Sequence, residues 1–329
     1  MEDLRSIIRI PRIWDSLASV EERLLEAATA DDAYLTKIAQ HLLLAGGKRF
    51  RPLLALLAAE LGPGDDRRPV EAAVAVELIH VGSLYHDDVI DESDTRRGAT
   101  SVNANWSNTV AILAGDFLMA RASVVAATHL SQESVRLLAE TYAELVEGQT
   151  RELQLEGDFT HGFEEYEKVI GAKTASLVRT SARLGAMAAD AAPETVEALS
   201  TWGWEVGMVF QIADDALDLV ADESTIGKPA GSDIREGTFT MPVLAAAAGD
   251  DGQRVRELLE PGIPYDDDTV TEVISLVRRG GHIEDALTAA TDRLTKAEAA
   301  LESIEPGPAH EILTELGTFL LARVERARR

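Results

Sequence analysis

Hydrophobic positions recur at intervals of three and four residues along almost the whole chain. This spacing places apolar side chains on one face of an α-helix, and the strict alternation that indicates a half-buried strand is scarce. The helix-favouring residues Ala, Leu, Glu and Arg dominate these segments. The pattern therefore predicts helices over about 17–30, 33–45, 50–62, 69–92, 107–128, 131–156, 163–188, 193–221, 239–249, 267–280, 281–304 and 308–327.

The breaks between these segments are short and rich in Gly, Pro and Asp, as turns are. They are "GPGDD" at 62–66, "TRRGAT" at 95–100, "PGIPYDDD" at 261–268 and "EPGPA" at 305–309, and the longest irregular stretch is roughly 222–238. None has the composition of an interdomain linker. We therefore expect an all-α fold with a single domain over residues 1–329.

Composition narrows the class of protein. The 329 residues are 46% hydrophobic and carry a net charge of −26, so the chain can bury a large core and lacks the basic face that nucleic-acid binding needs. The absence of cysteine excludes disulfides and thiolate metal ligands, and it fits a reducing compartment. No run approaches a membrane span in length, and the first residues lack the apolar core of a signal peptide. We expect a cytoplasmic protein with no nucleic-acid partner and no transmembrane segment.

One short pattern occurs twice. "DDVID" at 87–91 and "DDALD" at 214–218 both read Asp-Asp-x-x-Asp, and each ends a long apolar helical run. On a helix, the first and last Asp of such a motif lie one turn apart on the same side. Carboxylate oxygens in this arrangement suit Mg²⁺, which prefers oxygen ligands and bridges carboxylates to substrate phosphates. We call these the first and the second acidic motif.

A simpler interpretation is that each acidic motif is only a charged helix end on the surface. One copy alone favours that interpretation, whereas two copies after similar apolar helices favour a shared chemical task. A calcium-binding loop fits poorly, because its Asp-x-Asp-x-Asp-Gly spacing is missing.

Basic residues lie where a diphosphate bound through metal ions would need them. "GGKRFRP" at 46–52 carries Lys48 and Arg51 behind two glycines, which allow a tight turn and close approach of a ligand. Arg96 and Arg97 follow the first acidic motif, and His80 lies two helical turns before Asp87 on the same face. Arg forks and Lys ammonium groups both bind phosphate oxygens. Solvated surface charge is the alternative interpretation for each of them.

Long segments of the chain resemble the trans-isoprenyl diphosphate synthases, or polyprenyl synthetases. The resemblance rests on "GGKRFRP", "ELIHVGSLYHDDVIDESDTRRG" at 77–98, "AGDFLMARA" at 114–122, "EGQTREL" at 147–153, "KTASL" at 173–177, and "FQIADDALD" with the "GKPAGSD" that follows at 227–233. It covers nearly the whole chain. It implies the isoprenoid synthase fold, with ten or more helices around a deep central cavity, and a homodimer.

The resemblance also implies an activity, the head-to-tail condensation of an allylic diphosphate with isopentenyl diphosphate, and a role for each site residue. Mg²⁺, with about three ions for each active site, would be held by Asp87, Asp88, Asp91, Asp214, Asp215 and Asp218. The leaving diphosphate would be bound by Arg96, Lys173 and Lys228. Isopentenyl diphosphate would be bound by Lys48, Arg51, His80 and Arg97. The developing carbocation would be faced by Thr174 and Gln211.

Three positions bear on the length of the product or depart from the family pattern. Gly82 and Ser83, one turn before the first acidic motif, are small where short-chain relatives carry a bulky floor. By this resemblance we expect a product of roughly six to ten isoprene units, unless Gly82 serves only close helix packing. Thr238 stands where many relatives have Lys, which removes one cation from the diphosphate site. Whether a long apolar product leaves at a membrane surface is left open by the sequence.

Other functions remain alternatives at this stage. A geranylgeranyl or farnesyl diphosphate synthase would share every motif and differ only in product length. A class I terpene cyclase would not need the "GGKRFRP" segment or a second full acidic motif. A noncatalytic subunit of a heteromeric synthase would tend to lose the acidic motifs, which are both intact here.

Overall fold

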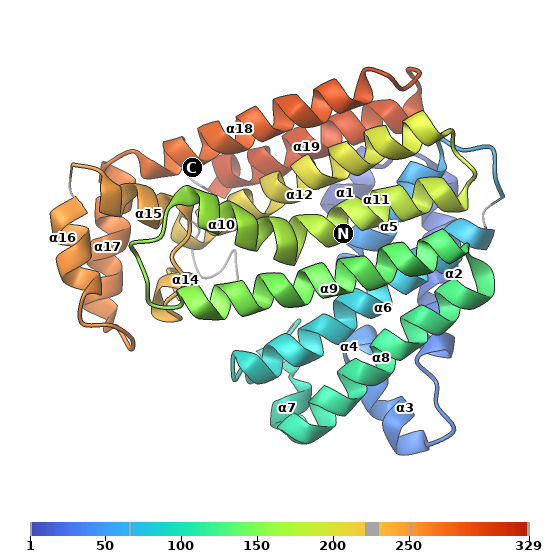
Figure 1. Ribbon diagram of the computed structural model, residues 1–329, viewed down its shortest axis with the longest axis horizontal. Coiled ribbons are helices and arrows are strands. Elements are labelled where there is room, and N and C mark those ends of the chain that lie inside the picture. Colours follow the sequence, from blue (N-terminus) through green and yellow to red (C-terminus); the bar gives the residue numbers. More distant parts are fainter. Residues whose placement is uncertain (1, 66, 221–229, 251, 328–329) are drawn as a thin grey trace. The chain divides into compact units, whose positions relative to one another are not determined.

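The computed structural model describes residues 2–65, 67–220, 230–250 and 252–327 (Figure 1). Most of these residues are helical, and the strands among them are two residues long each, which confirms the all-α expectation. The helices of the first half are α1 (Glu2–Ile7), α2 (Pro11–Ala27), α3 (Ala33–Ala39), α4 (His41–Leu44), α5 (Phe50–Ala59), α6 (Arg67–Ile90), α7 (Val102–Asn105), α8 (Asn108–His129) and α9 (Gln132–Leu155). Those of the second half are α10 (Phe163–Ile170), the π-helical turn η1 (Gly171–Ala175), α11 (Ser176–Ala188), α12 (Pro193–Val220), α14 (Ser232–Arg235), α15 (Met241–Ala248), α16 (Gly252–Leu259), α17 (Asp267–Arg279), α18 (His282–Leu301) and α19 (Pro308–Ala327).

The chain gathers into two compact units, each built from three separate stretches. Unit 1 comprises residues 1–142, 177–200 and 303–312, and unit 2 comprises residues 143–176, 201–302 and 313–329. The expectation of a single domain over 1–329 stays a prediction.

Several element boundaries differ from the pattern-based prediction. Helix α2 begins at Pro11, whose fixed φ suits the first helical position, and not near residue 17. The predicted continuous helix over 163–188 is interrupted by η1, and α16 was not predicted. Segment 95–100, predicted as a turn, forms a small hairpin of strands β1 (Thr95–Arg96) and β2 (Ala99–Thr100).

The core of unit 1 is organised around α6. This helix carries buried residues on all sides, among them Val74, Leu78 and Val81, because α2, α5 and α8 pack around it. Helices α6 and α8 lie side by side (Figure 1). A helix that is apolar all round is stable only when it is buried, and this placement fixes the first acidic motif at the end of a rigid element.

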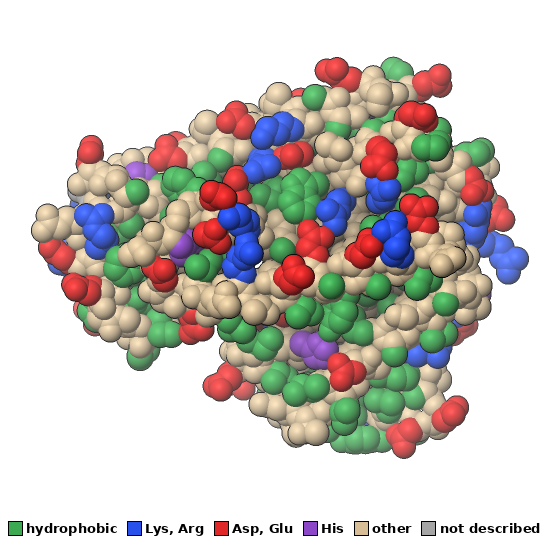
Figure 2. All heavy atoms as spheres, in the orientation of Figure 1, with side chains coloured by type: hydrophobic (Ala, Val, Ile, Leu, Met, Phe, Trp, Pro, Cys, Tyr) green, Lys and Arg blue, Asp and Glu red, His purple; other side chains and the backbone are tan. Residues whose placement is uncertain are grey.

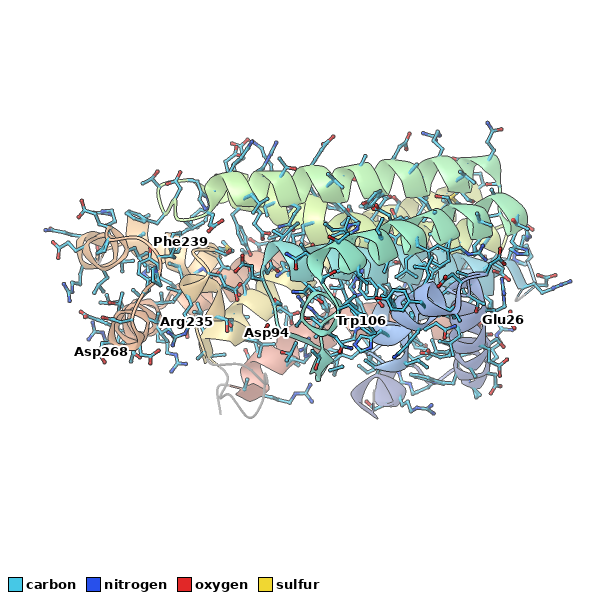
Figure 3. All side chains as sticks on the ribbon, turned by 90° about the horizontal axis from the view of Figure 1, so that it is seen from below. Glu26, Asp94, Trp106, Arg235, Phe239 and Asp268 are labelled. Atoms are coloured by element: carbon cyan, nitrogen blue, oxygen red, sulfur yellow. The ribbon has the colours of Figure 1, made fainter. Side chains whose placement is uncertain are left out.

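The core of unit 2 forms between α12 and the helices α15, α17 and α18. Ile212, Ala216 and Leu219 of α12 belong to this buried cluster, with Phe239 from the segment before α15 (Figure 3). Phe239 meets Phe159 edge to face, with 6.0 Å between ring centroids. The helix that carries the second acidic motif is therefore fixed on its apolar side.

The β1–β2 hairpin positions the two arginines after the first acidic motif. Arg96 pairs with Ala99 across the two strands, and Arg97 and Gly98 form the turn with φ of +54° and +75°. Positive φ at both central residues is what a two-residue type I′ hairpin requires. The backbone thus presents Arg96 and Arg97 in different directions.

Helix α8 meets the length and composition criteria for crossing a membrane, with a mean hydropathy of 1.7 over 18 residues. This corrects the expectation that no segment is apolar enough to be considered. Within unit 1, 39% of that window is buried, and a core helix packed on α6 satisfies the same criteria. Its outer face carries the exposed side chains of Ile112, Leu113 and Val124, and Figure 2 shows hydrophobic side chains gathered over α8.

Candidate active site

The first acidic motif spans the end of α6 in unit 1. Asp87 is half-buried, Asp88 is fully buried and Asp91 is exposed. The Asp91 N–H donates to the Asp87 carbonyl at 2.8 Å, so the helical turn continues through the motif. Asp87 and Asp91 therefore lie on the same side, as their spacing predicts.

Asp88 is held by contacts with two residues of the protein. Arg96 Nε donates to Asp88 Oδ1 at 2.6 Å, and Asn103 donates to the Asp88 carbonyl at 3.0 Å. Burial raises the pKa of Asp88, and the Arg96 guanidinium opposes that rise. The assignment of Arg96 to the leaving diphosphate stays a prediction, and the structure adds an ion pair within the protein.

Segment 46–49 forms a loop with an unusual backbone. Gly46 and Gly47 have φ of +84° and +153°, and Arg49 has a left-handed φ of +49°. A Cβ atom at Gly47 would lie 3.0 Å from Cζ of Arg97, so the glycine permits this close approach. Lys48 is exposed at the tip of the loop.

A group of basic side chains converges on α6 next to this loop. We call it the cation cluster, and its members are Arg49, Arg51, Arg96 and Arg97. Arg51 Nη1 lies 3.3 Å from His80 Nε2; since Arg can only donate, the histidine nitrogen accepts. Burial and the nearby arginines, Arg51 first, lower the pKa of His80 well below its ordinary value. His80 is therefore neutral in a strongly positive environment, which suits an anionic ligand.

The second acidic motif lies on α12 in unit 2, and its three carboxylates differ in burial and in hydrogen-bond partners. Asp214 is half-buried, with Arg323 Nη1 at 3.4 Å from its Oδ1. Asp218 is buried, and its Oδ2 accepts from the Asp233 backbone N–H at 3.3 Å. Asp215 is also buried.

A hydrogen-bond chain runs through Asp215. Tyr166 donates to Asp215 Oδ2 at 2.6 Å, and Gln211 Nε2 donates to Oδ1 at 2.8 Å. Thr174 Oγ1 in turn donates to Gln211 Oε1 at 2.7 Å. Burial, with the charges of Asp233 and Asp214, raises the pKa of Asp215 to about 8. The chain brings together three of the predicted site residues and adds Tyr166.

Lys173 and Thr174 lie in the π-helical turn η1. Such turns insert one extra residue into a helix and occur often at functional sites. The Lys173 ammonium is paired with Glu152 of α9. Lys228, predicted to bind the leaving diphosphate, lies outside the described residues. Thr238 is half-buried after α14, and its N–H donates to the Asp233 carbonyl at 2.8 Å.

Gly82 and Ser83 have different surroundings. A Cβ atom at Gly82 would lie 3.0 Å from Cε of Met119 and 3.2 Å from the Gly115 carbonyl oxygen, both on α8. Gly82 is buried against α8, as the alternative of close helix packing expects, and its part in product length stays a prediction. Ser83 is half-buried, and its hydroxyl donates to the His80 carbonyl. Its role in product length stays a prediction.

The residues of the first acidic motif fit a hard divalent cation. Asp88 Oδ2 is buried and has no hydrogen-bond partner among the described residues, so it is available to a cation. No group of three or more His, Asp and Glu side chains in the described residues forms a complete metal site by itself. Mg²⁺ commonly keeps several waters and takes phosphate oxygens as ligands, so a cation here would need the diphosphate and water to complete its coordination.

Sequence reasoning missed several residues that contact the predicted site, among them Glu77, Tyr166, Glu152 and Arg323. Glu77 lies one turn before His80 on α6, and Tyr166 lies seven residues before Lys173. Helical spacing could have pointed to Glu77, because i and i+3 share a face. It could not have pointed to Tyr166, because Lys173 lies in the π-helical turn η1, which shifts the helical register. Glu152 and Arg323 are contacts of Lys173 and Asp214 from distant helices, and no sequence pattern links them.

Comparison with known proteins identifies the family. Residues 32–277 match the polyprenyl synthetase family model. The chain belongs to the polyprenyl synthetase family. It is 40% identical to a nonaprenyl diphosphate synthase of Mycobacterium tuberculosis over 325 residues, which cover 98% of this chain and 96% of that protein.

Two further polyprenyl synthetases show how the relatives differ. The heptaprenyl diphosphate synthase component 2 of Geobacillus stearothermophilus is 39% identical over 93% of this chain and 95% of its own length. The crystal structure of geranylgeranyl pyrophosphate synthase from Corynebacterium glutamicum, complexed with calcium and isoprenyl diphosphate, has a TM-score of 0.85 and 42% identity. That match covers 95% of this chain and 96% of that one. The names of these relatives indicate both long and shorter products. One name also indicates an enzyme with more than one component.

Proposed function

We propose that this chain condenses an allylic diphosphate head-to-tail with isopentenyl diphosphate and repeats the step to give a long-chain all-trans polyprenyl diphosphate. The observation that carries the proposal is the cation cluster around neutral His80, beside an intact acidic motif on the same helix. Protein carboxylates pair with Arg49, Arg96 and Arg97, and Arg51 contacts His80; a diphosphate is the anion that we propose for this place. The nonaprenyl and heptaprenyl relatives support the long product.

The protein's task in this reaction is to stabilise the departing diphosphate and to exclude water. Asp87, Asp88 and Asp91 of the first acidic motif would hold Mg²⁺, and so would Asp214, Asp215 and Asp218 of the second. The bound ions would neutralise charge on the leaving oxygens. Asp88, Asp215 and Asp218 each also accept a hydrogen bond from the protein, which would orient their carboxylates, and the second oxygen of Asp88 stays available to a cation. The number of three ions stays a prediction.

Thr174 and Gln211 would face the carbon from which diphosphate departs. The Thr174 hydroxyl donates a hydrogen bond to Gln211, so the lone pairs of the hydroxyl oxygen remain available to a developing positive charge. Fixed dipoles in a dry site stabilise such charge without reorganisation. The double bond of isopentenyl diphosphate is the nucleophile, and the released diphosphate accepts the proton that leaves when the new double bond forms.

A homodimer is part of the proposal. The exposed face of α8 carries Ile112, Leu113 and Val124, and a second copy would cover these apolar side chains. Asp116, also exposed on α8, does not suit a lipid-facing surface. The heteromeric relative leaves a second, unlike subunit as the alternative, and the mass of the purified chain in solution distinguishes the two.

The test is to incubate the purified chain with Mg²⁺, isopentenyl diphosphate and allylic primers of increasing length, followed by chromatography of the products. Long products from the chain alone support the proposal. Products that stop at farnesyl or geranylgeranyl length indicate the shorter-chain alternative. No turnover with any primer indicates a subunit that needs a partner.

A further inference from the structure

A buried carboxylate, Glu77, lies at the centre of the cation cluster. Its side chain on α6 is 1% exposed. Glu77 Oε1 accepts a hydrogen bond from Arg49 Nη1 at 2.9 Å and lies 3.5 Å from Arg97 Nη2. Buried carboxylates are rare unless paired, and this one is shared between two arginines of the cluster.

Arg49 is held on several sides. Its Nε and Nη2 donate to the Glu21 carboxylate at 2.6 and 2.9 Å, and Nη2 also donates to the Leu43 carbonyl at 2.9 Å. The residue is 3% exposed and has a left-handed backbone. These contacts bind the guanidinium to the protein, so Arg49 fixes the loop 46–49 and leaves ligand binding to its neighbours.

Arg97 contacts the same loop from the hairpin. Its Nη1 donates to the Gly46 carbonyl at 2.6 Å and to the Leu42 carbonyl at 3.3 Å, while Nη2 faces Glu77. The Gly47 backbone comes so close that a Cβ there would meet the guanidinium. Glu77 and two carbonyl oxygens therefore determine where the Arg97 guanidinium lies.

We propose that Glu77 is a positioning residue for isopentenyl diphosphate: it holds Arg49 and Arg97 against loop 46–49, so that the binding site is formed before the substrate arrives. The proposal rests on the proposed function for the identity of the diphosphate. Preorganised groups lose less entropy on binding, and displacement of a binding group by about 1 Å can cost up to 100-fold in rate.

If Glu77 had a purely electrostatic role, its removal would have the opposite effect on diphosphate binding. If its negative charge only offsets the cluster, removal of that charge leaves a more positive site and strengthens diphosphate binding. Two substitutions separate geometry from charge. Glu77→Asp keeps the charge but withdraws the carboxylate from both arginines, and Glu77→Gln keeps the size but removes the charge.

The experiment measures KM for isopentenyl diphosphate, KM for the allylic primer and kcat for both variants. We expect Glu77→Asp and Glu77→Gln to raise KM for isopentenyl diphosphate about tenfold, with KM for the primer changed less than twofold. Glu71→Gln is the matched control, because Glu71 lies on the same helix and pairs with Arg23 at 2.9 Å, away from the cluster. It should leave all three constants unchanged.

Calorimetric titration with isopentenyl diphosphate, without primer, gives a readout that does not depend on turnover. Weaker binding of isopentenyl diphosphate by Glu77→Asp supports the positioning role even if the chain forms no product. A lack of product would count against the proposed function and not against the positioning role. Unchanged binding by Glu77→Asp, or stronger binding by Glu77→Gln, overturns the positioning role. In an Arg97→Gln background, Glu77→Asp should have little further effect, since both act through one contact.

Thermal unfolding of each variant shows whether it folds. If neither Glu77 variant folds, Glu21→Gln loosens the same network from its half-exposed side. This variant should raise KM for isopentenyl diphosphate several-fold and leave KM for the primer unchanged. An unchanged KM for isopentenyl diphosphate in folded Glu21→Gln would contradict the proposal.

Discussion

Tyr166 donates a 2.6 Å hydrogen bond to Oδ2 of Asp215, and both residues are buried in unit 2. Gln211 binds the other oxygen of the same carboxylate at 2.8 Å. A carboxylate held at both oxygens has a fixed orientation and fewer lone pairs for a ligand. Asp215 therefore differs from Asp214, which is half-buried beside it.

We expect Tyr166→Phe to weaken the second acidic motif. Loss of the hydroxyl leaves the buried Asp215 with one donor fewer, which should lower the free energy of unfolding by about 1–3 kcal/mol. It should also raise the Mg²⁺ concentration for half-maximal activity several-fold. Tyr265→Phe is the control, because its hydroxyl binds the Leu259 carbonyl. Equal Mg²⁺ requirements in the two variants would contradict the role of Tyr166.

Arg323 Nη1 lies 3.4 Å from Asp214 Oδ1, where it competes with metal ions for that carboxylate. We expect Arg323→Gln to lower the Mg²⁺ concentration for half-maximal activity several-fold, because a competing cation is removed. Arg326→Gln is the control, because Arg326 lies over the Phe319 ring. This variant should leave the Mg²⁺ concentration for half-maximal activity unchanged. A higher Mg²⁺ requirement in Arg323→Gln would indicate instead that Arg323 binds the diphosphate.

His80 should make stability depend on pH. Its pKa in the folded protein lies well below 6.5, so below about pH 6.5 the unfolded chain binds a proton that the folded chain does not. The free energy of unfolding is therefore higher above about pH 6.5 and decreases as the pH falls, by at most about 1.4 kcal/mol per pH unit. Urea unfolding at several pH values should show a smaller loss in His80→Gln. The exposed His129→Gln should behave like the wild type, and a His80→Gln loss as large as that of the wild type would refute the assignment.

Product length should respond to Ser83 and not cleanly to Gly82. Gly82→Phe must displace Met119 and the α8 backbone, so it should lower the free energy of unfolding by about 1–3 kcal/mol. Ser83→Phe should leave the fold intact and shorten the products separated by chromatography. If folded Ser83→Phe gives the same distribution of product lengths as the wild type, Ser83 does not determine product length.

The sequence predicted the helical architecture because amphipathic periodicity is a local property, and most helices appear within a few residues of their expected bounds. It could not predict the π-helical turn at Gly171–Ala175 or the hairpin at 95–100. Both depend on small differences in backbone energy that packing decides. The start of α2 at Pro11 was recognisable from its proline, but the periodic pattern before residue 17 is weak.

By itself, the sequence determined the helix on which each acidic motif lies and which aspartates share a face, since spacing along a helix fixes direction. Tertiary structure alone decided which carboxylates are held by the protein: Asp88 by Arg96 and Asp215 by Tyr166. It also decided that Glu77 lies among arginines and that Gly82 meets α8. Burial and hydrogen-bond partners are provided by residues that are distant in the chain. A local sequence pattern therefore cannot predict them.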